Sequence, residues 1–305
     1  MAGSPTQLAA EQIIEANRRY HDHAASRYDA KWGISFDRLA EEQVVAKARR
    51  AFGEPLPSLG RALEIGAGTG YFSLNLLRAG LIEELTCTDL SPGMLRALRR
   101  NARALSLTVR TRSCSAESLP FADRSFDSVI GHAVLHHLPH LEVAFAELFR
   151  VVRPGGTIFF AGEPSAVGDR IATVPKRLGA TLAPVWRRLL GARARNGHGP
   201  TPPSASLEAI VDVHAFTPAT LADLARSAGF AEVRVIGEEL LANWFGWTNR
   251  TLEASAEAET IPWLWRQYAY RGYLLLQRLD RAVLEPALPA SLFYNLTLVA
   301  RKPQA

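Results

Sequence analysis

The chain has 305 residues, of which 48% are hydrophobic and 21% charged, and its formal net charge is +5 at pH 7. This length suits one large α/β domain that carries insertions. No stretch approaches the roughly 18 uninterrupted apolar residues of a membrane-spanning helix, and the N-terminal segment lacks the apolar core of a signal peptide. We therefore expect a cytoplasmic protein. The two cysteines, Cys87 and Cys114, lack ligand-like spacing, so we expect reduced thiols and no metal site.

The first 60 residues are predicted to form a helical arm, because apolar residues recur among charged ones, with an interruption near residues 29–35. Residues 61–65 then form a short apolar run that ends in glycines. Helical spacing follows over residues 71–79. This order of strand, glycine-rich loop and helix is the opening of an α/β unit.

Strands and helices continue to alternate along the chain. We expect further strands at residues 85–89, 107–114, 126–132, 156–161, 231–236 and 293–302, and helices at residues 92–104, 141–152 and 217–229. A turn at Pro154, Gly155 and Gly156 is expected to precede the fifth strand. Strands that alternate with helices predict a doubly wound, mostly parallel sheet with right-handed crossovers.

The strongest motif is the run LEIGAGTG at residues 63–70, where the first strand turns into a helix. Gly66 and Gly68 allow a tight turn and let a nucleotide-like ligand approach the backbone closely. Asp89 ends the second strand, where a carboxylate can accept hydrogen bonds from ribose hydroxyls. NAD-binding proteins share both of these features.

Two details separate the two kinds of cofactor. The dinucleotide fingerprint requires glycine where this chain has Tyr71, and the third glycine is Gly70 instead. Glu64 would repel a pyrophosphate, whereas it suits the ammonium group of a methionine moiety. The spacing therefore favours S-adenosylmethionine (SAM) as the cofactor.

Successive segments resemble the motifs of class I SAM-dependent methyltransferases. They are residues 64–70, DLSP at 89–92, AESLPF at 116–121, FD at 126–127 and VRPGG at 152–156. The branch that the chain resembles includes the ubiquinone/menaquinone biosynthesis methyltransferases. The resemblance covers residues 61–161, and more weakly 216–236. It implies a seven-stranded Rossmann-like sheet with an antiparallel last strand, and SAM across the ends of the first two strands.

The cofactor-binding residues implied by the resemblance lie at strand ends or in the turns that follow: Glu64, Gly66, Gly68, Gly70, Asp89, Leu90, Met94, Ser115, Ala116, Glu117 and His132. Glu64 is placed near the methionine amino group and Asp89 on the ribose. Leu90 and Met94 would flank adenine, although Met94 also suits an ordinary core position. The family commonly has aspartate where this chain has Ser115, whose hydroxyl can still accept from the adenine amino group.

Catalysis of methyl transfer needs few protein groups, because it is an in-line displacement at a sulfonium carbon. A base is required only for hydroxyl or carbon-acid acceptors, whose proton must leave. His136 and His137 follow the fourth strand and are our candidates for that base. Paired histidines at this place are common in the family irrespective of the acceptor, so a structural or helix-capping role is the alternative.

The resemblance and the element pattern together divide the chain into six segments: a helical arm (1–60), a SAM-binding core (61–164), a basic insert (165–213), a core helix and strand (214–237), an aromatic helical cap (238–290), and a final strand with a tail (291–305). The basic insert is broken by proline and glycine. Three interpretations of its charge stay open, namely a solvated helix face, contact with a membrane surface or acidic substrate, and a nucleic-acid site. Trp186 beside Arg187 and Arg188 would suit an interfacial helix.

The cap segment, residues 238–290, holds many aromatic side chains, among them Trp263 and Trp265. They are expected either to enclose an apolar acceptor or simply to pack the cap onto the core. We expect a SAM-dependent methyltransferase with a small or lipid-like, partly hydrophobic acceptor, favouring O- or C-methylation and without a nucleic-acid partner. The alternatives are a SAM-binding protein without methyl transfer and an NAD(P)-dependent oxidoreductase.

Overall fold

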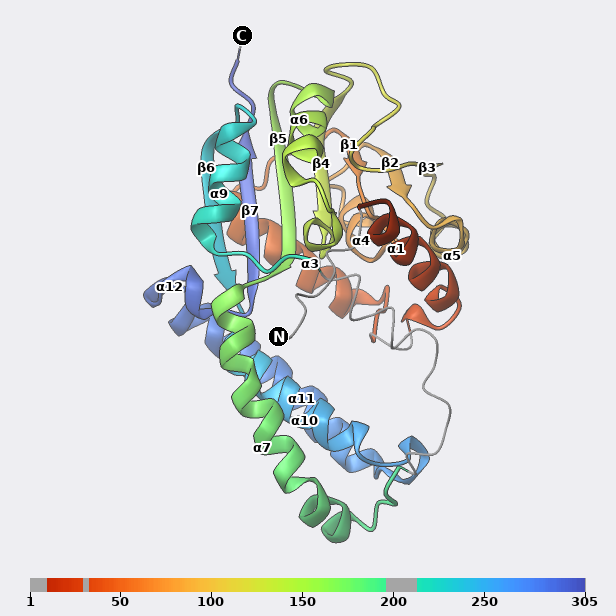
Figure 1. The fold of residues 1–305 in the computed structure, drawn as a ribbon, viewed down its shortest axis with the longest axis vertical. Coiled ribbons are helices and arrows are strands. Elements are labelled where there is room, and N and C mark those ends of the chain that lie inside the picture. Colours follow the sequence, from red (N-terminus) through yellow and green to blue (C-terminus); the bar gives the residue numbers. More distant parts are fainter. Residues whose placement is uncertain (1–9, 30–32, 196–212, 305) are drawn as a thin grey trace, which may run out of the picture.

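The computed structural model describes residues 10–29, 33–195 and 213–304. At its centre lies a seven-stranded sheet with the order β3-β2-β1-β4-β5-β7-β6 (Figure 1). The strands are β1 (Arg61–Glu64), β2 (Glu84–Asp89), β3 (Arg110–Ser113), β4 (Phe126–His132), β5 (Val152–Pro164), β6 (Ala231–Glu238) and β7 (Asn295–Arg301). Strands β1 to β5 run parallel, whereas β7 is antiparallel to both of its neighbours. The predicted Rossmann-like methyltransferase fold is confirmed.

Helices cover both faces of this sheet. One face is covered by α3 (Arg38–Phe52), α4 (Tyr71–Arg78) and α5 (Pro92–Ala104), and the other by α6 (Leu141–Val151) and α9 (Pro218–Ser227). Each helix buries an apolar stripe against the strands, as amphipathic spacing requires. Short 3-10 turns lie at η1 (Leu135–His137), η2 (Ala258–Thr260) and η4 (Ala290–Leu292).

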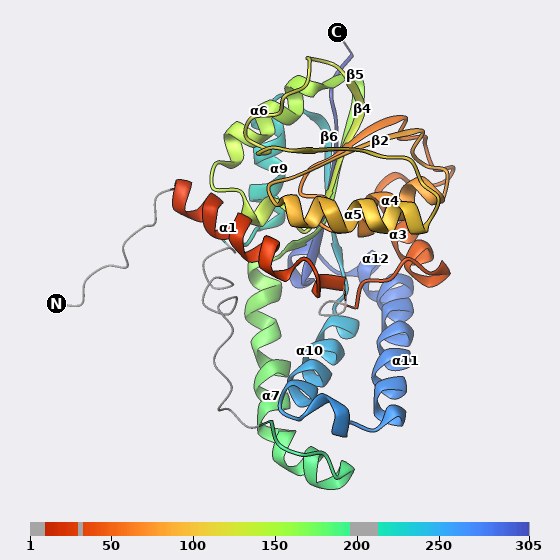
Figure 2. The ribbon, with the colours of Figure 1, turned by 90° about the vertical axis from the view of Figure 1, so that its right-hand side faces the viewer.

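A cap of three long helices projects from the carboxyl edge of the sheet (Figures 1 and 2). It consists of α7 (Ala166–Leu190), which follows β5, together with α10 (Leu241–Ala254) and α11 (Trp263–Leu279), which follow β6. A π-helical turn, η3 (Asp280–Leu284), and α12 (Glu285–Ala287) lead back toward β7. Among the described helices, none is long and apolar enough to cross a membrane.

Strand β5 and helix α7 both differ from the sequence-based expectation. Strand β5 already begins at Val152 and takes in the expected turn at 154–156 as an irregularity in its pairing with β4. Helix α7 continues through Pro175 and Pro184, although the segment was expected to be broken. Packing against α10 accounts for this, because Gly179 allows the two helices to approach closely and a Cβ there would lie 2.9 Å from Thr251.

The Trp186 ring does not face outward, as a side chain inserted in an interface would. Its ring is only 7% exposed and packs edge-on against Trp265, with the ring centroids 5.2 Å apart. The two tryptophans close the far end of the cap with Leu252, Ala256 and Ile261. Trp265 therefore packs inside the cap and stabilises it, whereas Trp263, which is 67% exposed, faces outward.

Two helices of the cap are joined by a buried carboxylate at the start of η3. Asp280 is fully buried and accepts hydrogen bonds from the backbone N–H groups of Leu240, Leu241 and Ala242, at 2.9 to 3.0 Å. These are donors at the N-terminus of α10, which have no partner inside their own helix. One side chain thus fixes the start of α10 to the end of α11.

Candidate active site

The glycine-rich loop, residues 65–70, joins β1 to α4 at the carboxyl edge of the sheet. Gly66, Gly68 and Gly70 have φ values of 56°, 52° and 91°, a region that favours glycine. A Cβ on Gly66 would lie 2.2 Å from Val134, whereas a Cβ on Gly68 would meet nothing within 4 Å. The loop is therefore packed against the protein at Gly66 and open at Gly68, where a ligand can approach the backbone.

Asp89 ends β2 beside this loop and is 9% exposed. One of its carboxylate oxygens accepts from the backbone N–H of Gly68 and the other from that of Ser91, each at 2.8 Å. An ionised carboxylate can accept about four hydrogen bonds, so about two remain for the hydroxyls of a ribose. Burial raises the pKa of Asp89, while His21 and the two N–H groups act in the opposite direction. The geometry fits the predicted ribose contact.

The hydroxyl oxygen of Thr69, in the same loop, adds to this fit. It is buried and has no hydrogen-bond partner in the part of the chain that the structure describes. Buried polar atoms are nearly always satisfied by protein, water or ligand. A polar ligand at the loop is one way to satisfy it.

Glu64 ends β1 and is 1% exposed. Its carboxylate accepts from the Ser73 hydroxyl of α4 and lies 4.0 Å from the sulfur of Cys87. Burial raises the pKa of Glu64 to about 8, and the neighbouring Asp89 adds to the rise. Glu64 is therefore largely protonated at neutral pH, and an ammonium group placed beside it would favour its ionised form. Its contact with the methionine amino group stays a prediction.

The residues predicted around adenine differ in burial. Met94 is fully buried in α5, as an ordinary core residue would be. The others are half-buried: Leu90, Ser115, Ala116 and Glu117. The Ser115 hydroxyl accepts from the backbone N–H of Glu117 at 3.1 Å, which holds this turn in place. The adenine contacts of these residues remain predictions.

His136 and Glu163 form a pair at the carboxyl ends of β4 and β5. Nδ1 of His136 lies 2.9 Å from Oε2 of Glu163, and both side chains are buried. The Glu163 carboxylate also accepts from the backbone N–H groups of Val134, Leu135 and His136. Burial alone would raise the pKa of Glu163, but the bonds from His136 and the backbone hold it below its usual value. The ring of His136 is thus oriented by an ionised carboxylate.

His137, the second catalytic candidate, lies against His136 with the ring centroids 4.0 Å apart. On its other side is His21 of α1 (Ala10–Ala24), with the centroids 5.5 Å apart. Helix α1 also reaches the start of α5, because Asp22 accepts from the Ser91 hydroxyl at 2.6 Å and from the Gly93 N–H at 2.7 Å. Helix α1, which lies beside α5 in Figure 2, therefore connects the start of α5 with the histidine turn.

His132 ends β4 beside two aromatic rings of α4. Its ring lies 5.6 Å from that of Tyr71 and 5.3 Å from that of Phe72. Burial lowers the pKa of His132 to about 4, and the positive charge of Lys47 adds to the effect, so the ring is neutral near pH 7. Lys47 itself is paired with Glu238 at 2.6 Å. No group of three His, Cys, Asp or Glu in the described ranges is placed to hold a metal ion.

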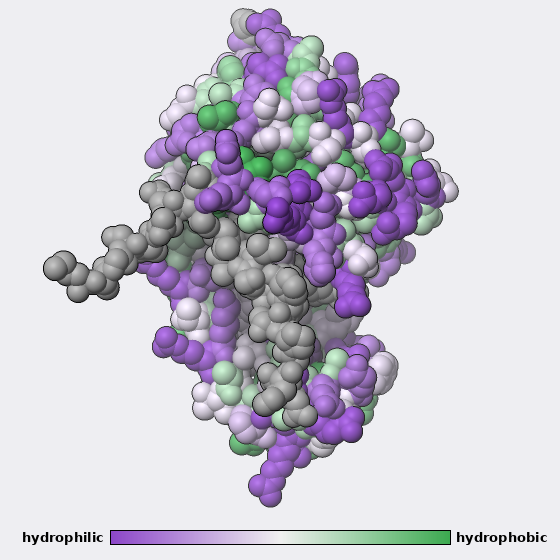
Figure 3. All heavy atoms as spheres, turned by 45° about the vertical axis from the view of Figure 1, so that its right-hand side comes forward, coloured by the Kyte–Doolittle hydropathy of each residue, from purple (hydrophilic) through white to green (hydrophobic). Residues whose placement is uncertain are grey.

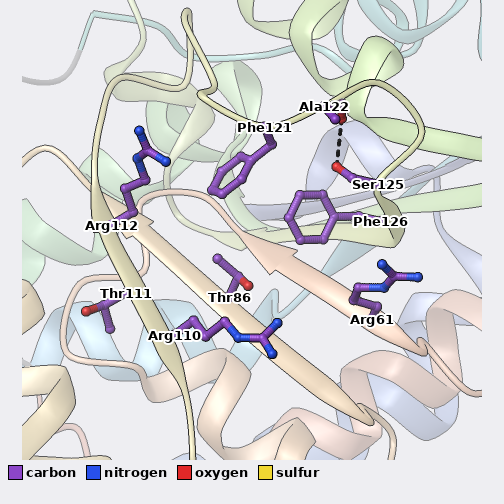
Figure 4. Close-up of a pocket in the computed structure, with 9 residues that line it drawn as sticks. All are labelled: Arg61, Thr86, Arg110, Thr111, Arg112, Phe121, Ala122, Ser125 and Phe126. Carbon is purple, nitrogen blue, oxygen red and sulfur yellow. Dashed lines mark hydrogen bonds between the residues drawn. The ribbon is translucent and has the colours of Figure 1, made fainter.

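A cavity of about 390 Å³ lies elsewhere, over β1 to β3 toward their amino ends (Figure 4). It is bordered by Arg61, Arg110 and Arg112, with the rings of Phe121 and Phe126 as apolar walls. None of the predicted cofactor or catalytic residues borders it. It exists because the segment between β3 and β4 forms turns and leaves this part of the sheet without a covering helix.

Sequence reasoning missed Glu163 and Asp22. A glutamate at the end of the apolar run IFFAGE was a usable signal for Glu163, because an ionisable group there needs a partner. The register of β4 and β5, which pairs His132 with Ala161, then brings the histidine turn to it. Asp22 had no local signal, since its partners are about 70 residues away.

Residues 63–160 match the family model described as a methyltransferase domain. The malonyl-[acyl-carrier protein] O-methyltransferase of Methylococcus capsulatus is 35% identical over 159 residues, which are 47% of this chain and 56% of that protein. The demethylmenaquinone methyltransferase of Thermus thermophilus is 37% identical over 98 residues, 32% of this chain and 44% of that protein. The chain spans about half the length of the curated relatives it matches.

Among solved structures, the chain is similar to phosphoethanolamine N-methyltransferase 2 of Haemonchus contortus, in complex with phosphomonomethylethanolamine and S-adenosylhomocysteine. The TM-score is 0.58 at 16% identity, over 99% of this chain and 62% of that one. At such low identity the likeness concerns the fold alone. Together with the family match, it gives one conclusion: residues 63–160 match a methyltransferase domain, and the sheet that holds them has the Rossmann-like methyltransferase fold.

Proposed function

We propose that the full chain is a SAM-dependent methyltransferase that acts on a small, partly hydrophobic acceptor through oxygen or carbon. One observation carries the proposal. Asp89, at the end of β2, bonds the open backbone of Gly68 in the loop after β1. The carboxylate–histidine pair at the ends of β4 and β5 lies on the same edge of the sheet. A cofactor-binding edge and a proton-accepting group thus lie at one edge of the sheet.

Residues of the glycine-rich loop and of the ends of β1 and β2 bind the cofactor in this proposal. Asp89 accepts from the ribose hydroxyls, the loop at Gly66 and Gly68 lies under the cofactor, and Glu64 faces the methionine end. SAM supplies an electrophilic methyl group when bound. The half-buried turn at 115–117 borders the adenine. These assignments rest on the hydrogen-bond capacity of Asp89 and on the open backbone at Gly68.

His136 serves as the base in this proposal and Glu163 as the positioning residue. An ionised Glu163 favours the tautomer in which Nδ1 of His136 carries the proton, which leaves Nε2 as the basic atom. A base of this kind is useful only when the acceptor must lose a proton, as a hydroxyl or a carbon acid does. The buried carboxylate–histidine pair therefore supports O- or C-methylation over transfer to a neutral amine. The name of one relative, malonyl-[acyl-carrier protein] O-methyltransferase, agrees with an oxygen acceptor.

The cap supports an acceptor with apolar parts. Tyr273 of α11 donates to Glu239 at 2.9 Å, and Trp247 of α10 packs edge-on against Tyr294, so aromatic side chains of the cap lie where it meets the core. Trp263 and Trp265 lie at the start of α11, at the end of the cap that is far from the core, and are not part of the proposed acceptor site. A site enclosed by rings excludes water from the reaction.

The test is a comparison of metabolite and lipid extracts after incubation with SAM and either the active protein or the His136→Ala variant. Mass spectrometry should find a compound that gains one methylene only with the parent, and it should partition into organic solvent. A product found only in the polar fraction would contradict the apolar acceptor and leave methyl transfer intact. If no compound gains a methylene, the proposal fails as a whole.

A further inference from the structure

Helix α7 carries an apolar stripe on its outer side. The stripe repeats every three or four residues and is 44 to 80% exposed: Val174, Leu178, Leu182, Val185 and Leu189. With 3.6 residues per turn, these positions share one face of the helix. Scattered apolar residues are normal on a protein surface, but a continuous stripe of five along one helix marks an interaction site.

A neighbouring side of α7 is already used for packing. Pro175, Gly179, Ala183 and Trp186 are buried there, mainly against α10. The helix is therefore held in the cap without help from the outer stripe. Among the residues that the structure describes, the outer stripe is left exposed.

Three arginines run beside the stripe. Arg170, Arg177 and Arg188 follow helical spacing, which places them in one exposed row next to the leucines. None of them forms an ion pair with any residue that the structure describes. Over residues 166–195 the chain is rich in Arg and Lys and has one acidic residue, Asp169, which is paired with Lys176 at 3.4 Å. This side of the cap is thus apolar and strongly positive at once.

We infer that the outer face of α7 docks on an anionic lipid surface. A helix that combines an apolar stripe with a basic row lies in the interface plane, with its apolar side chains in the acyl boundary and its cations among the headgroups. A second copy of the chain is the less suitable occupant, because a symmetric contact would bring the two arginine rows together without acidic partners. The inference does not depend on methyl transfer.

The test is co-sedimentation of the full chain with phosphatidylcholine vesicles, with and without phosphatidylglycerol. The parent should bind only the anionic vesicles, and binding should weaken with salt. The variant Arg170→Gln, Arg177→Gln, Arg188→Gln should partition roughly 100-fold less, since each basic residue near an anionic surface contributes about 1 kcal/mol. The variant Leu178→Ser, Leu189→Ser should also release the protein, because it removes the apolar anchor.

Matched controls lie on the core. Arg99, Arg100 and Arg103 are exposed on α5, where hydrophilic side chains gather in Figure 3, and their replacement by Gln makes the same change of charge. Val143 on α6 is 48% exposed and serves as the apolar control, as Val143→Ser. Both controls should keep binding. The inference is overturned if the parent does not bind anionic vesicles, or if the α5 variant loses as much binding as the α7 arginine variant. It is also overturned if sedimentation shows that the parent is a dimer and that Leu178→Ser, Leu189→Ser is a monomer.

Discussion

Glu163 holds His136 through a hydrogen bond of 2.9 Å between Oε2 and Nδ1, and neither side chain is exposed by more than a tenth. The same carboxylate accepts from three successive backbone N–H groups of the histidine turn. A single residue of β5 therefore fixes both the backbone of this turn and the ring that it carries. The base is oriented before any acceptor arrives, which is what proximity-based catalysis requires.

The first prediction concerns this pair. His136→Ala should lower turnover roughly 100-fold or more while SAM affinity stays nearly unchanged, because only proton transfer is lost. Glu163→Gln should lower turnover as well and shift the pH–rate profile, because a neutral amide cannot favour a charged ring. Turnover and calorimetry measure the two effects. His140→Ala, an exposed histidine of the same segment, is the control and should behave like the parent. Parallel losses of SAM affinity and thermal stability in His136→Ala would favour a structural role instead.

The second prediction follows from the buried carboxyl of Glu64. Its pKa of about 8 lies above the value near 4.5 of an unfolded chain, so the folded state binds the extra proton between these two pH values. The contribution of Glu64 to the stability of the parent should therefore fall as the pH rises from about 4.5 to about 8. The glutamine side chain of Glu64→Gln does not titrate, so this variant does not lose stability by that route as the pH rises. The difference in the free energy of unfolding, Glu64→Gln minus parent, should therefore increase across this range by several kcal/mol, at about 1.4 kcal/mol for each pH unit.

Urea unfolding at acidic, neutral and alkaline pH measures this difference. Glu83→Gln, at an exposed glutamate just before β2, is the control and should track the parent at every pH. A constant difference between Glu64→Gln and the parent would show that Glu64 is not protonated in the folded protein.

The third prediction concerns the joint between α10 and α11 within the cap. Asp280→Ala leaves three backbone N–H groups at the start of α10 without their acceptor, so it should destabilise the protein by about 2 to 4 kcal/mol. Thermal unfolding and proteolysis of the cap would detect the change. Asp223→Ala, on α9, removes a carboxylate whose ion pair with Arg226 is exposed and should cost under about 1 kcal/mol. Equal effects of the two substitutions would mean that Asp280 does not hold the start of α10.

Local patterns predicted the parts of the site that local sequence determines. The loop at Gly66 and Gly68 and the position of Asp89 depend on one strand, one turn and the next strand, and parallel strands bring their carboxyl ends to one edge. The contact between Glu163 and His136 spans 27 residues and depends on strand register. The pair of Lys47 and Glu238 spans 191 residues. No periodicity within a segment contains such information.

The helices of the cap also could not be predicted from local sequence alone. Pro175 and Pro184 are local signals against a helix, and they were outweighed by the packing of α7 on α10. Trp186 looked interfacial beside its two arginines, but Trp265, 79 positions along the chain, buries it. Helical spacing correctly places side chains on faces of α7. Which face is covered depends on helices that come later in the chain.

The fourth prediction concerns the ribose contact. Asp89→Asn keeps the shape of the side chain but removes its charge, so SAM binding should weaken about 10-fold or more, because hydrogen bonds to charged groups contribute about 1.5 to 3 kcal/mol each. Calorimetry measures the affinity. Asp127→Asn is the control, since its carboxylate binds the Arg61 N–H at the other end of β1. Unchanged affinity in Asp89→Asn would remove Asp89 from the ribose site.

The central claim, methyl transfer from SAM, is tested most directly with methyl-labelled SAM and a total cell extract, separated afterwards into organic and aqueous fractions. The parent should move label into an organic-soluble product in step with formation of S-adenosylhomocysteine, and His136→Ala should move at least roughly 100-fold less. The contradicting result is a parent protein that binds SAM in calorimetry yet transfers label to neither fraction, because that protein would bind the cofactor without methylating anything.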